Sequence, residues 1–302
     1  MISSYVDIAL EVKEALDNGK PIIAIETGGT FEGLPYPDCV TTANQVCEKV
    51  RAMGVVPAYI AVVKGKIKVG MTPDEIDEFG QHKAGAAKVS VRELPTLLAQ
   101  GRDGIMTIAA TMMIADLLSI PVVAGCGIGG VHRGVEDTMD ISADLEEIAV
   151  RNVVVVCSGA KAILDLARTM EYLETKSIPV IGYGTDELPA YMARTSGIKL
   201  PCRMDTVEEV AKSYRIKNEL GINQGMLLMN PISEEYAVDA DEMNAAIDAA
   251  VRLSVEQGVT GKPLTKFIMT EVKNRMGDDS EGAHKQLILQ DAILAAELAR
   301  QI

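Results

Sequence analysis

The chain has 302 residues, of which 48% are hydrophobic and 24% charged, a composition that suits a globular protein with a sizeable core and excludes intrinsic disorder. Lys and Arg together number 29 against 43 Asp and Glu, so the formal net charge is −14, which argues against a nucleic acid polymer as the partner. An anionic small molecule would need a local cluster of positive side chains. The five cysteines show no CxxC spacing and are expected to be reduced thiols.

The N-terminal segment, residues 1–19, mixes acidic with apolar residues and has no uninterrupted apolar stretch. It therefore predicts an amphipathic helix and not a signal peptide. The apolar-rich stretch at residues 105–115 is too short to cross a bilayer, which takes about 20 residues. We expect a cytoplasmic protein that has no membrane partner.

Along the rest of the chain, short apolar or β-branched runs alternate with stretches of helical spacing, which is the pattern of an α/β protein. Strands are expected at residues 21–25, 56–63, 105–108, 122–124, 153–157, 180–182 and 226–229. Helices are expected at residues 72–80, 90–99, 142–149, 161–175, 206–220, 239–257 and 286–300. Most strands should pair in parallel through these helices, although residues 58–63 and 66–69 predict a hairpin and hence a mixed sheet. A single domain over residues 1–302 is expected, with a helical C-terminal part from about residue 235.

The first junction between a strand and the segment after it carries a carboxylate. Ligands of open α/β sheets gather at the carboxyl ends of strands, where Glu26 is followed by Gly28 and Gly29. The two glycines permit a close approach of the backbone. Glu26 is therefore a candidate acid or base, and the structural alternative is that it caps a turn or a helix.

A second junction is the glycine-rich segment 125–134, which follows the strand at residues 122–124. Its backbone amides suit an anion, and His132 and Arg133 add positive charge. A plain tight loop explains this segment equally well.

Two carboxylates, Asp140 and Asp144, follow this loop with Ser142 between them. Oxygen ligands of this kind suit Mn²⁺ or Mg²⁺. Acidic residues in the first turn of a helix are also favoured by the helix dipole, and the spacing alone is better explained in that way.

A third junction leads from four valines into Ser158 and Lys161, where the helix at residues 161–175 is expected to begin. A lysine at a helix N-terminus opposes the dipole, and a desolvated amine there should have a lowered pKa suited to Schiff-base chemistry. A solvated lysine at a helix start is the alternative. Lys88 is a further candidate cation for a phosphate.

Together these segments resemble the pseudouridine-5′-phosphate glycosidases, also described as the indigoidine synthase A family, along nearly the whole chain. The matching stretches follow one another at residues 34–37, 66–70, 88–95, 107–112, 127–134, 140–145, 158–165, 172–175, 179–187, 230–236 and 295–297. The resemblance implies a three-layer α/β/α sandwich around a mixed, mostly parallel sheet, and a homotrimer. It also implies reversible cleavage of the C–C glycosidic bond of pseudouridine 5′-phosphate to uracil and ribose 5-phosphate.

The resemblance further implies roles for individual residues. Lys161 would be the Schiff-base nucleophile, Glu26 the proton donor, and Asp140 the ligand of a Mn²⁺ or another divalent cation held otherwise by water. The implied substrate-binding residues are Lys88, Ile108, Ser142, Ala143 and Asp144, with His132 assisting in phosphate or proton handling. A lysine nucleophile suits this reaction because a C–C bond offers no basic leaving oxygen for the two-carboxylate route of ordinary glycosidases.

The chain departs from the family pattern at positions expected to face the base. Glu32 replaces a histidine, Gly125 a threonine, Cys126 a glycine, and His284 the asparagine that helps to hold the base. The sharper hypothesis is that the enzyme acts on a C-riboside phosphate with another base, or works in the synthetic direction. The neutral explanation is that these positions drifted in sequence in a distant homologue. A non-catalytic sugar-phosphate binder is a third reading, which the intact catalytic positions argue against.

Overall fold

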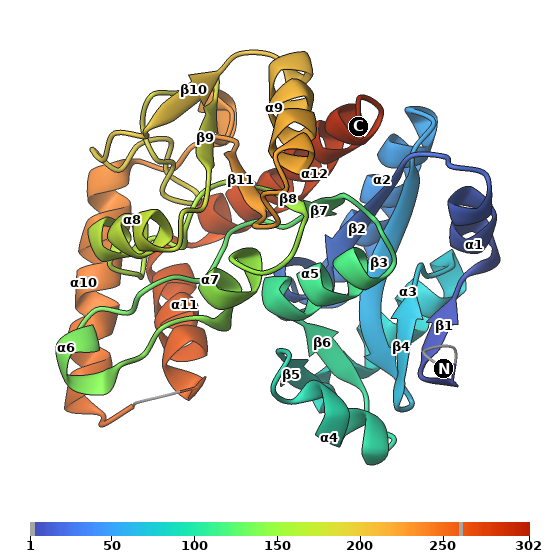
Figure 1. Ribbon diagram of the computed structural model, residues 1–302. Coiled ribbons are helices and arrows are strands. Elements are labelled where there is room, and N and C mark those ends of the chain that lie inside the picture. Colours follow the sequence, from blue (N-terminus) through green and yellow to red (C-terminus); the bar gives the residue numbers. More distant parts are fainter. Residues whose placement is uncertain (1–3, 260–261) are drawn as a thin grey trace.

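The computed structural model describes residues 4–259 and 262–302. Within them, an 11-stranded mixed sheet forms the middle layer (Figure 1). Its main path runs β1-β4-β3-β2-β7-β8-β11-β9-β10, and β6 joins β3 and carries β5. The strands are β1 (Val6–Ile8), β2 (Ile22–Glu26), β3 (Val56–Val63), β4 (Lys66–Val69), β5 (Ala87–Val89), β6 (Gly104–Met106), β7 (Val122–Ala124), β8 (Val154–Cys157), β9 (Val180–Tyr183), β10 (Cys202–Met204) and β11 (Met226–Met229).

Helices follow most of these strands. They are α1 (Leu10–Asp17), α2 (Asp38–Ala52), α3 (Pro73–His82), α4 (Leu94–Ala99), α5 (Ile108–Leu117), α6 (Val135–Thr138), α7 (Ala143–Ile148), α8 (Leu166–Thr175), α9 (Val207–Glu219), α10 (Ala240–Glu256), α11 (Lys262–Met276) and α12 (Asp278–Ala299). Short helical turns lie at η2 (Gly28–Glu32), η3 (Lys83–Gly85) and η4 (Glu234–Tyr236). No helix of the described segments is both long and apolar enough to span a bilayer.

The pairing of the strands confirms a mixed, mostly parallel sheet. β3 runs antiparallel to β4 and β6, and the other pairings of named strands within the described residues are parallel. The expected hairpin is β3–β4, in which Lys64 and Gly65 both have positive φ, as a two-residue type I′ turn requires.

Two helical layers enclose the sheet and complete the expected α/β/α sandwich. On one face, Arg51 of α2 donates to Glu11 of α1, and α12 packs on α2 and across β2, β7 and β8. On the other face α5 packs on β2 and β7 and against α7, while Tyr172 of α8 donates to Glu146 of α7. Figure 1 shows α5 and α7 on the opposite side of the central strands from α12.

Several boundaries differ from the sequence prediction. The N-terminal segment is not one helix, because residues 6–8 form a parallel strand with β4 before α1 begins. The helix expected at residue 161 begins only at Leu166, and α12 begins at residue 278 instead of 286. The apolar stretch after residue 105 is a strand only to Met106, since Ile108 opens α5, a helix that is apolar all round because it lies between the sheet and α7.

The C-terminal part is helical from residue 240 onward within the described segments, in α10, α11 and α12. It does not pack on itself alone, since α12 lies against the central strands and α9. The single domain itself stays a prediction.

Candidate active site

Three adjacent parallel strands, β2, β7 and β8, place the sequence-predicted junctions at one edge of the sheet. Glu26 is the last residue of β2, Gly125 and Cys126 follow β7, and Lys161 follows β8 by four residues. Carboxyl ends of neighbouring parallel strands point the same way, so these residues converge although they are far apart in sequence.

Glu26 is buried at the end of β2, with only 6% of its surface exposed. The next residue fixes its position, because the Thr27 hydroxyl donates to the Ile60 carbonyl at 2.9 Å and accepts from the Met106 amide at 2.8 Å. Burial raises the pKa of Glu26 to about 7, against the opposing influence of Lys161. A carboxyl group with a pKa near neutrality can serve as both acid and base.

The glycines around Glu26 allow the backbone to close over the carboxyl group. A Cβ on Gly28 would lie 2.9 Å from Glu26 Oε2, and one on Gly29 would clash with Cys126 Sγ. Opposite them, a Cβ on Gly125 would lie 2.8 Å from Ile108 Cδ1. Side chains larger than glycine would therefore fill the space beside Glu26.

Lys161 lies in the loop between β8 and α8 and is partly buried. It is five residues before the first residue of α8, so the helix dipole does not act on it as the sequence argument supposed. Its pKa is raised instead of lowered: burial lowers it, but Glu26, Cys126, Asp144 and Glu32 together outweigh burial. Lys161 is thus a charged amine that needs a nearby base before it can act as a nucleophile.

Asp144 joins the glycine-rich loop to α5. Its Oδ1 accepts from the Ala109 amide and its Oδ2 from the Gly129 amide, both at 2.8 Å. Ser142 caps α7 by accepting from the Asp144 amide at 3.2 Å, and Ala143 is exposed in the first turn. The structure therefore gives Asp144 and Ser142 partners within the protein, and their contact with substrate stays a prediction.

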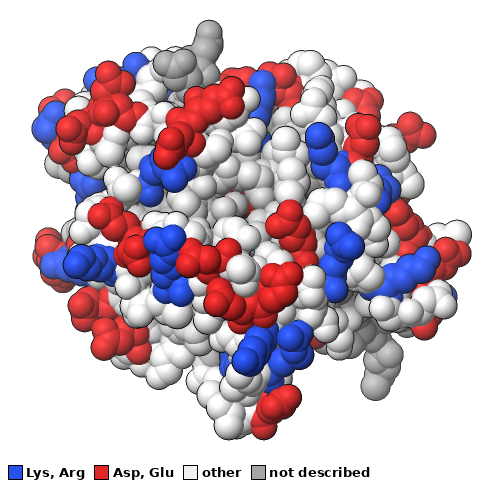
Figure 2. Space-filling model, turned by 90° about the horizontal axis from the view of Figure 1, so that it is seen from above, with Lys and Arg blue, Asp and Glu red and all other residues white. Residues whose placement is uncertain are grey.

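Charged side chains surround this core. Lys88 Nζ lies 3.0 Å from Glu32 Oε2, and His132 Nδ1 lies 4.0 Å from Asp140 Oδ2. Burial lowers the pKa of His132, as do Lys161 and Lys88, while Asp140 opposes the shift. On the face drawn in Figure 2, Lys and Arg are interspersed with Asp and Glu and form no extended basic patch. A phosphate-sized anion would therefore be bound by individual cations such as Lys88.

Comparison with known proteins gives the family of the chain. The family model described as indigoidine synthase A like protein matches residues 11–301. The chain belongs to the indigoidine synthase A-like family. Among its relatives, the pseudouridine-5′-phosphate glycosidase of Clostridium botulinum is 44% identical over 100% of this chain and 98% of that protein. The pseudouridine-5′-phosphate glycosidase of Escherichia coli is 46% identical over 98% of this chain and 95% of that protein.

Two solved structures of the indigoidine synthase A-like fold match almost the whole chain. The prealnumycin C-glycosynthase AlnA, solved in complex with ribulose 5-phosphate, is 34% identical with a TM-score of 0.88 and covers 97% of this chain and 95% of its own. An indigoidine synthase A-like protein from Thermotoga maritima is 33% identical with a TM-score of 0.87 and covers 98% and 96%.

Few residues could hold the divalent cation that the sequence predicts. No group of three or more His, Cys, Asp or Glu side chains with metal-binding geometry occurs among the described residues. The Asp140 carboxylate is about one third exposed, and its amide is held by the Thr138 hydroxyl. A single accessible carboxylate fits an ion that keeps most of its water, as Mg²⁺-type ions do, and does not fit a cage of protein ligands.

His284 comes from α12 and is buried against Gly29 and Tyr191. Its Nε2 lies 2.7 Å from the Gly29 carbonyl oxygen, and its Nδ1 lies 2.7 Å from the Tyr191 hydroxyl. Burial lowers the pKa of His284 to about 4, so the ring is neutral. The contact of His284 with a base stays a prediction, and a base would have to displace one of these two partners.

Two buried residues near the site were not anticipated. Tyr191 contacts both Cys126 and His284, and Asp291 of α12 accepts from Ser158 at 2.9 Å. Their importance arises from long-range packing, and the sequence around Tyr191 carries no motif that would have singled it out. The Ser158–Lys161 segment was recognised, but its partner 133 residues away was not.

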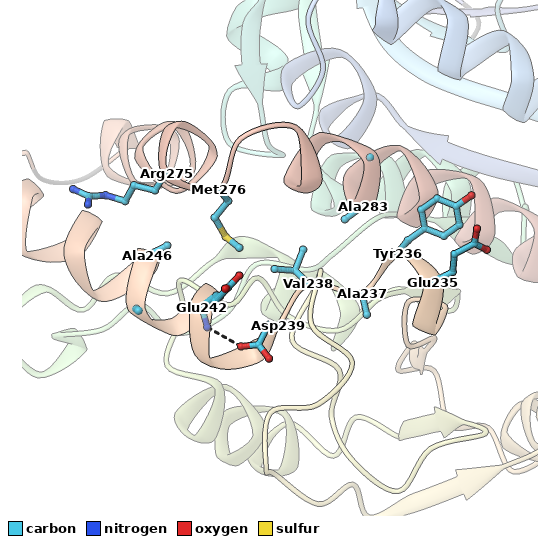
Figure 3. Close-up of a pocket in the computed structure, with 12 residues that line it drawn as sticks. Glu235, Tyr236, Ala237, Val238, Asp239, Glu242, Ala246, Arg275, Met276 and Ala283 are labelled. Carbon is cyan, nitrogen blue, oxygen red and sulfur yellow. Dashed lines mark hydrogen bonds between the residues drawn. The ribbon is translucent and has the colours of Figure 1, made fainter.

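Two cavities were compared with the candidate catalytic residues. A small one of about 10 Å³, room for about one water molecule, is lined by Ile25, Glu26, Gly29, Thr30, Ala124, Gly125, Cys126 and Ile288. A larger one of about 830 Å³ lies among η4, α10, α11 and the start of α12. Figure 3 shows Met276 and Val238 facing its interior and Arg275 pointing away. None of the candidate catalytic residues lines the larger cavity.

Proposed function

We propose that this chain is a pseudouridine-5′-phosphate glycosidase that reversibly cleaves the C–C bond between uracil and ribose 5-phosphate. The observation that supports the proposal most is a buried acid, Glu26, whose charge interacts with that of the Lys161 amine at the carboxyl edge of the sheet. The full-length relatives bear the name of this activity. The pentose phosphate bound to the C-glycosynthase AlnA supports a sugar phosphate as the substrate class.

The chemistry follows from the two groups. Protonated Glu26 gives its proton to the ring oxygen of the ribose as the C1′–O4′ bond breaks, and the neutral Lys161 amine forms a bond to C1′. The ionised Glu26 then takes back a proton from the alkylated Lys161 nitrogen, and transfer of this proton to the base carbon breaks the C1′–C bond while the freed nitrogen lone pair forms the iminium. Water adds to the iminium, which releases ribose 5-phosphate and restores the amine.

The raised pKa of Lys161 keeps its amine protonated, and the raised pKa of Glu26 makes this carboxyl group a suitable base to deprotonate it. A carboxyl group with a pKa of about 7 is partly protonated at neutral pH and can donate, whereas its ionised form can accept a proton from the Lys161 ammonium. Glu26 can therefore accept the proton of Lys161 at one step and donate a proton to the substrate at another. Lys88 is the cation that we expect to bind the phosphate.

A divalent cation, Mn²⁺ in our proposal, would be held by Asp140 and water. When bound, it would add positive charge beside the substrate anion. Mn²⁺ binding to the protein and to Asp140→Ala, followed by electron paramagnetic resonance, tests this role without turnover. Equal binding by both proteins would remove Asp140 as the ligand.

Borohydride trapping tests the proposed nucleophile. Reduction in the presence of ribose 5-phosphate should add a pentose-phosphate mass to the peptide that carries Lys161 and to no other lysine. Lys161→Arg, which keeps the charge, should show no adduct. An adduct on a different lysine would reject the assignment.

A second candidate is the same chemistry with another base. It is favoured by Gly125 and Cys126, which line the small cavity beside Glu26, and by His284, whose ring nitrogens already have protein partners. Incubation with ribose 5-phosphate and a panel of bases, analysed by mass spectrometry, separates the two candidates. Uracil as the preferred base would support the first.

Assembly and compartment remain proposals that rest on the family resemblance. We propose a cytoplasmic homotrimer, and analytical ultracentrifugation of the purified chain would give its mass in solution. A monomeric mass would contradict the proposed homotrimer.

A further inference from the structure

Four buried side chains form a chain of hydrogen bonds that ends on the candidate acid. Glu26 Oε1 lies 3.5 Å from Cys126 Sγ, which lies 3.5 Å from the Tyr191 hydroxyl, and this hydroxyl lies 2.7 Å from His284 Nδ1. His284 Nε2 closes the chain on the Gly29 carbonyl oxygen at 2.7 Å. All four side chains are at most 6% exposed, so bulk water does not compete for these bonds.

The bond between His284 and the Gly29 carbonyl fixes which group donates at every step of this hydrogen-bond chain. A carbonyl oxygen only accepts, so His284 Nε2 must carry the hydrogen that it donates to Gly29. The neutral ring then presents Nδ1 as an acceptor, and Tyr191 donates its single hydroxyl hydrogen to it. The Tyr191 oxygen can therefore only accept from the Cys126 thiol.

The thiol has one hydrogen and two neighbours. When Glu26 is ionised, the S–H group donates to Glu26 Oε1, which is a bond to a charged acceptor. When Glu26 carries a proton on Oε1, that proton can be donated to Sγ, and the S–H group turns to the Tyr191 oxygen. Every group in the chain is satisfied in both states, and the thiol keeps its own hydrogen throughout.

We propose that Cys126, oriented by Tyr191 and His284, is a reversible hydrogen-bond partner of Glu26 that stabilises both protonation states of this acid. Tyr191 and His284 are then positioning residues for the reaction, because they act on Glu26 only through Cys126. The inference rests on the proposed function for its role in turnover. The hydrogen-bond switch itself can be measured without substrate.

Other titratable groups also face this hydrogen-bond chain and influence the pKa values of its members. Lys161 favours the ionised form of Glu26 and Asp144 the protonated form. The further titratable groups that face its members are Tyr59 at Glu26, Asp291 at Cys126 and Tyr191, and Lys161, Lys273 and Glu281 at His284. All of these are retained in the variants proposed below, so differences between variants report on the chain.

Infrared difference spectroscopy across the titration of Glu26 tests the switch. The S–H stretching band of Cys126 should shift as the carboxyl band of Glu26 appears, and this shift should vanish in Cys126→Ala and in Glu26→Gln. Cys157→Ala is the matched control, because Cys157 is an equally buried thiol that contacts Met229 instead of Glu26. The control should keep the shift.

The variants should move the pKa of Glu26 in opposite directions. Tyr191→Phe removes the acceptor that the thiol needs when Glu26 is protonated, so the pKa should fall by about half to one unit. Cys126→Ala removes the partner of both forms, but the bond to the ionised carboxylate is the stronger, so the pKa should rise by a similar amount, about half to one unit. Cys126→Ser, whose hydroxyl can donate and accept, should return the pKa toward that of the unmodified protein.

Shifts of the same sign in Tyr191→Phe and Cys126→Ala, or an S–H band that does not respond to Glu26, would overturn the inference. The spectra need no turnover. A responding thiol in a protein that traps no sugar on Lys161 would therefore support the switch and reject the proposed function, and the converse result would do the reverse.

Discussion

Glu26 is the residue at which catalysis and stability oppose each other. Its folded pKa of about 7 lies above the ordinary value of 4.5, because burial disfavours the ionised form. The folded state therefore binds more protons than the unfolded state between these two pH values. The free energy of unfolding should fall as the pH rises through this interval, and the loss is complete above about pH 7.

Glu26→Gln separates the two effects. Turnover should drop by about 10²- to 10⁴-fold, since the proton donor is gone. At pH 8 the variant should be more stable than the unmodified protein by up to about 3 kcal/mol, and this difference should shrink toward pH 4.5. Urea unfolding of both proteins at several pH values gives the difference directly. A difference that does not depend on pH would contradict the raised pKa.

Glu32 competes with the substrate phosphate for Lys88 if Lys88 is the phosphate-binding cation. Glu32→Gln removes one anionic partner of Lys88 and should lower KM for the phosphorylated substrate by about two- to fivefold, in keeping with a partly exposed ion pair. The KM of an unphosphorylated C-nucleoside should not change. Glu78→Gln, which breaks the exposed pair with Lys64, is the control. An equal effect on both substrates would exclude competition with the phosphate.

Two of the candidate catalytic residues could be chosen from the sequence, but the physical argument for one of them did not hold. Glu26 and Lys161 could be chosen because each follows a strand, and the strand order then brings them together. The rationale for Lys161 was wrong, because α8 begins at Leu166 and neighbouring carboxylates raise its pKa. Tyr191 could not be found, since its role depends on contacts with Cys126, which is 65 positions away in the sequence, and with His284, which is 93 positions away.

At the scale of elements, the turn from β8 to Lys161 is held by Gly159. This residue has φ +87°, and a Cβ on it would collide with the Pro189 backbone. Tyr191 donates its amide to the Ser158 carbonyl, and the Lys161 amide donates to Ile128, so the loop is tied on both sides. A glycine is therefore required for the position of Lys161.

Gly159→Ala should destabilise the protein by about 2–4 kcal/mol and displace Lys161. Residual folded protein should then trap little or no ribose 5-phosphate. Gly184→Ala is a matched control, because Gly184 also has a positive φ, +63°, but no atom lies within 4 Å of its added Cβ. It should cost about 1 kcal/mol and leave trapping intact. Equal losses in the two variants would show that φ alone, and not the collision with Pro189, matters.

Elements with a clear period or a continuous apolar run were predictable. The four residues of β8 are fully buried and flanked by parallel strands, and this environment selects the valine run that marks them in the sequence. Short edge elements such as β1 and β10 were missed, since three residues that pair on one side carry too little pattern. The start of α12 was placed too late because its first turns form part of the packing around α11.

For the whole molecule, α12 links distant parts of the chain to the site. It carries His284 to the end of β2 and Asp291 to the end of β8. Asp291 is 1% exposed, and burial raises its pKa well above the usual value, which favours its protonated form. Asn230 donates to its Oδ1 at 2.7 Å.

Asp291→Asn should cost less than about 1 kcal/mol, because an amide has nearly the shape and hydrogen-bonding capacity of a protonated carboxyl group. Asp291→Ala should cost about 2–4 kcal/mol, since it removes a partner from buried Ser158 and from partly buried Asn230. Thermal and urea unfolding compare the two variants with Asp248→Ala, an exposed carboxylate paired with Arg133, which should change little. A loss in Asp291→Asn as large as that in Asp291→Ala would indicate an ionised Asp291.

The packing of α12 against β2, β7 and β8 also dictates an order of events during synthesis. The strand that ends in Glu26 leaves the ribosome more than 250 residues before the helix that covers it, so a nascent chain exposes this apolar edge until α12 emerges. Early strands can pair, but the pocket around Glu26 cannot close. Chaperone binding to chains stalled on a C-terminal linker should therefore fall sharply once the linker is long enough for α12 to clear the exit tunnel.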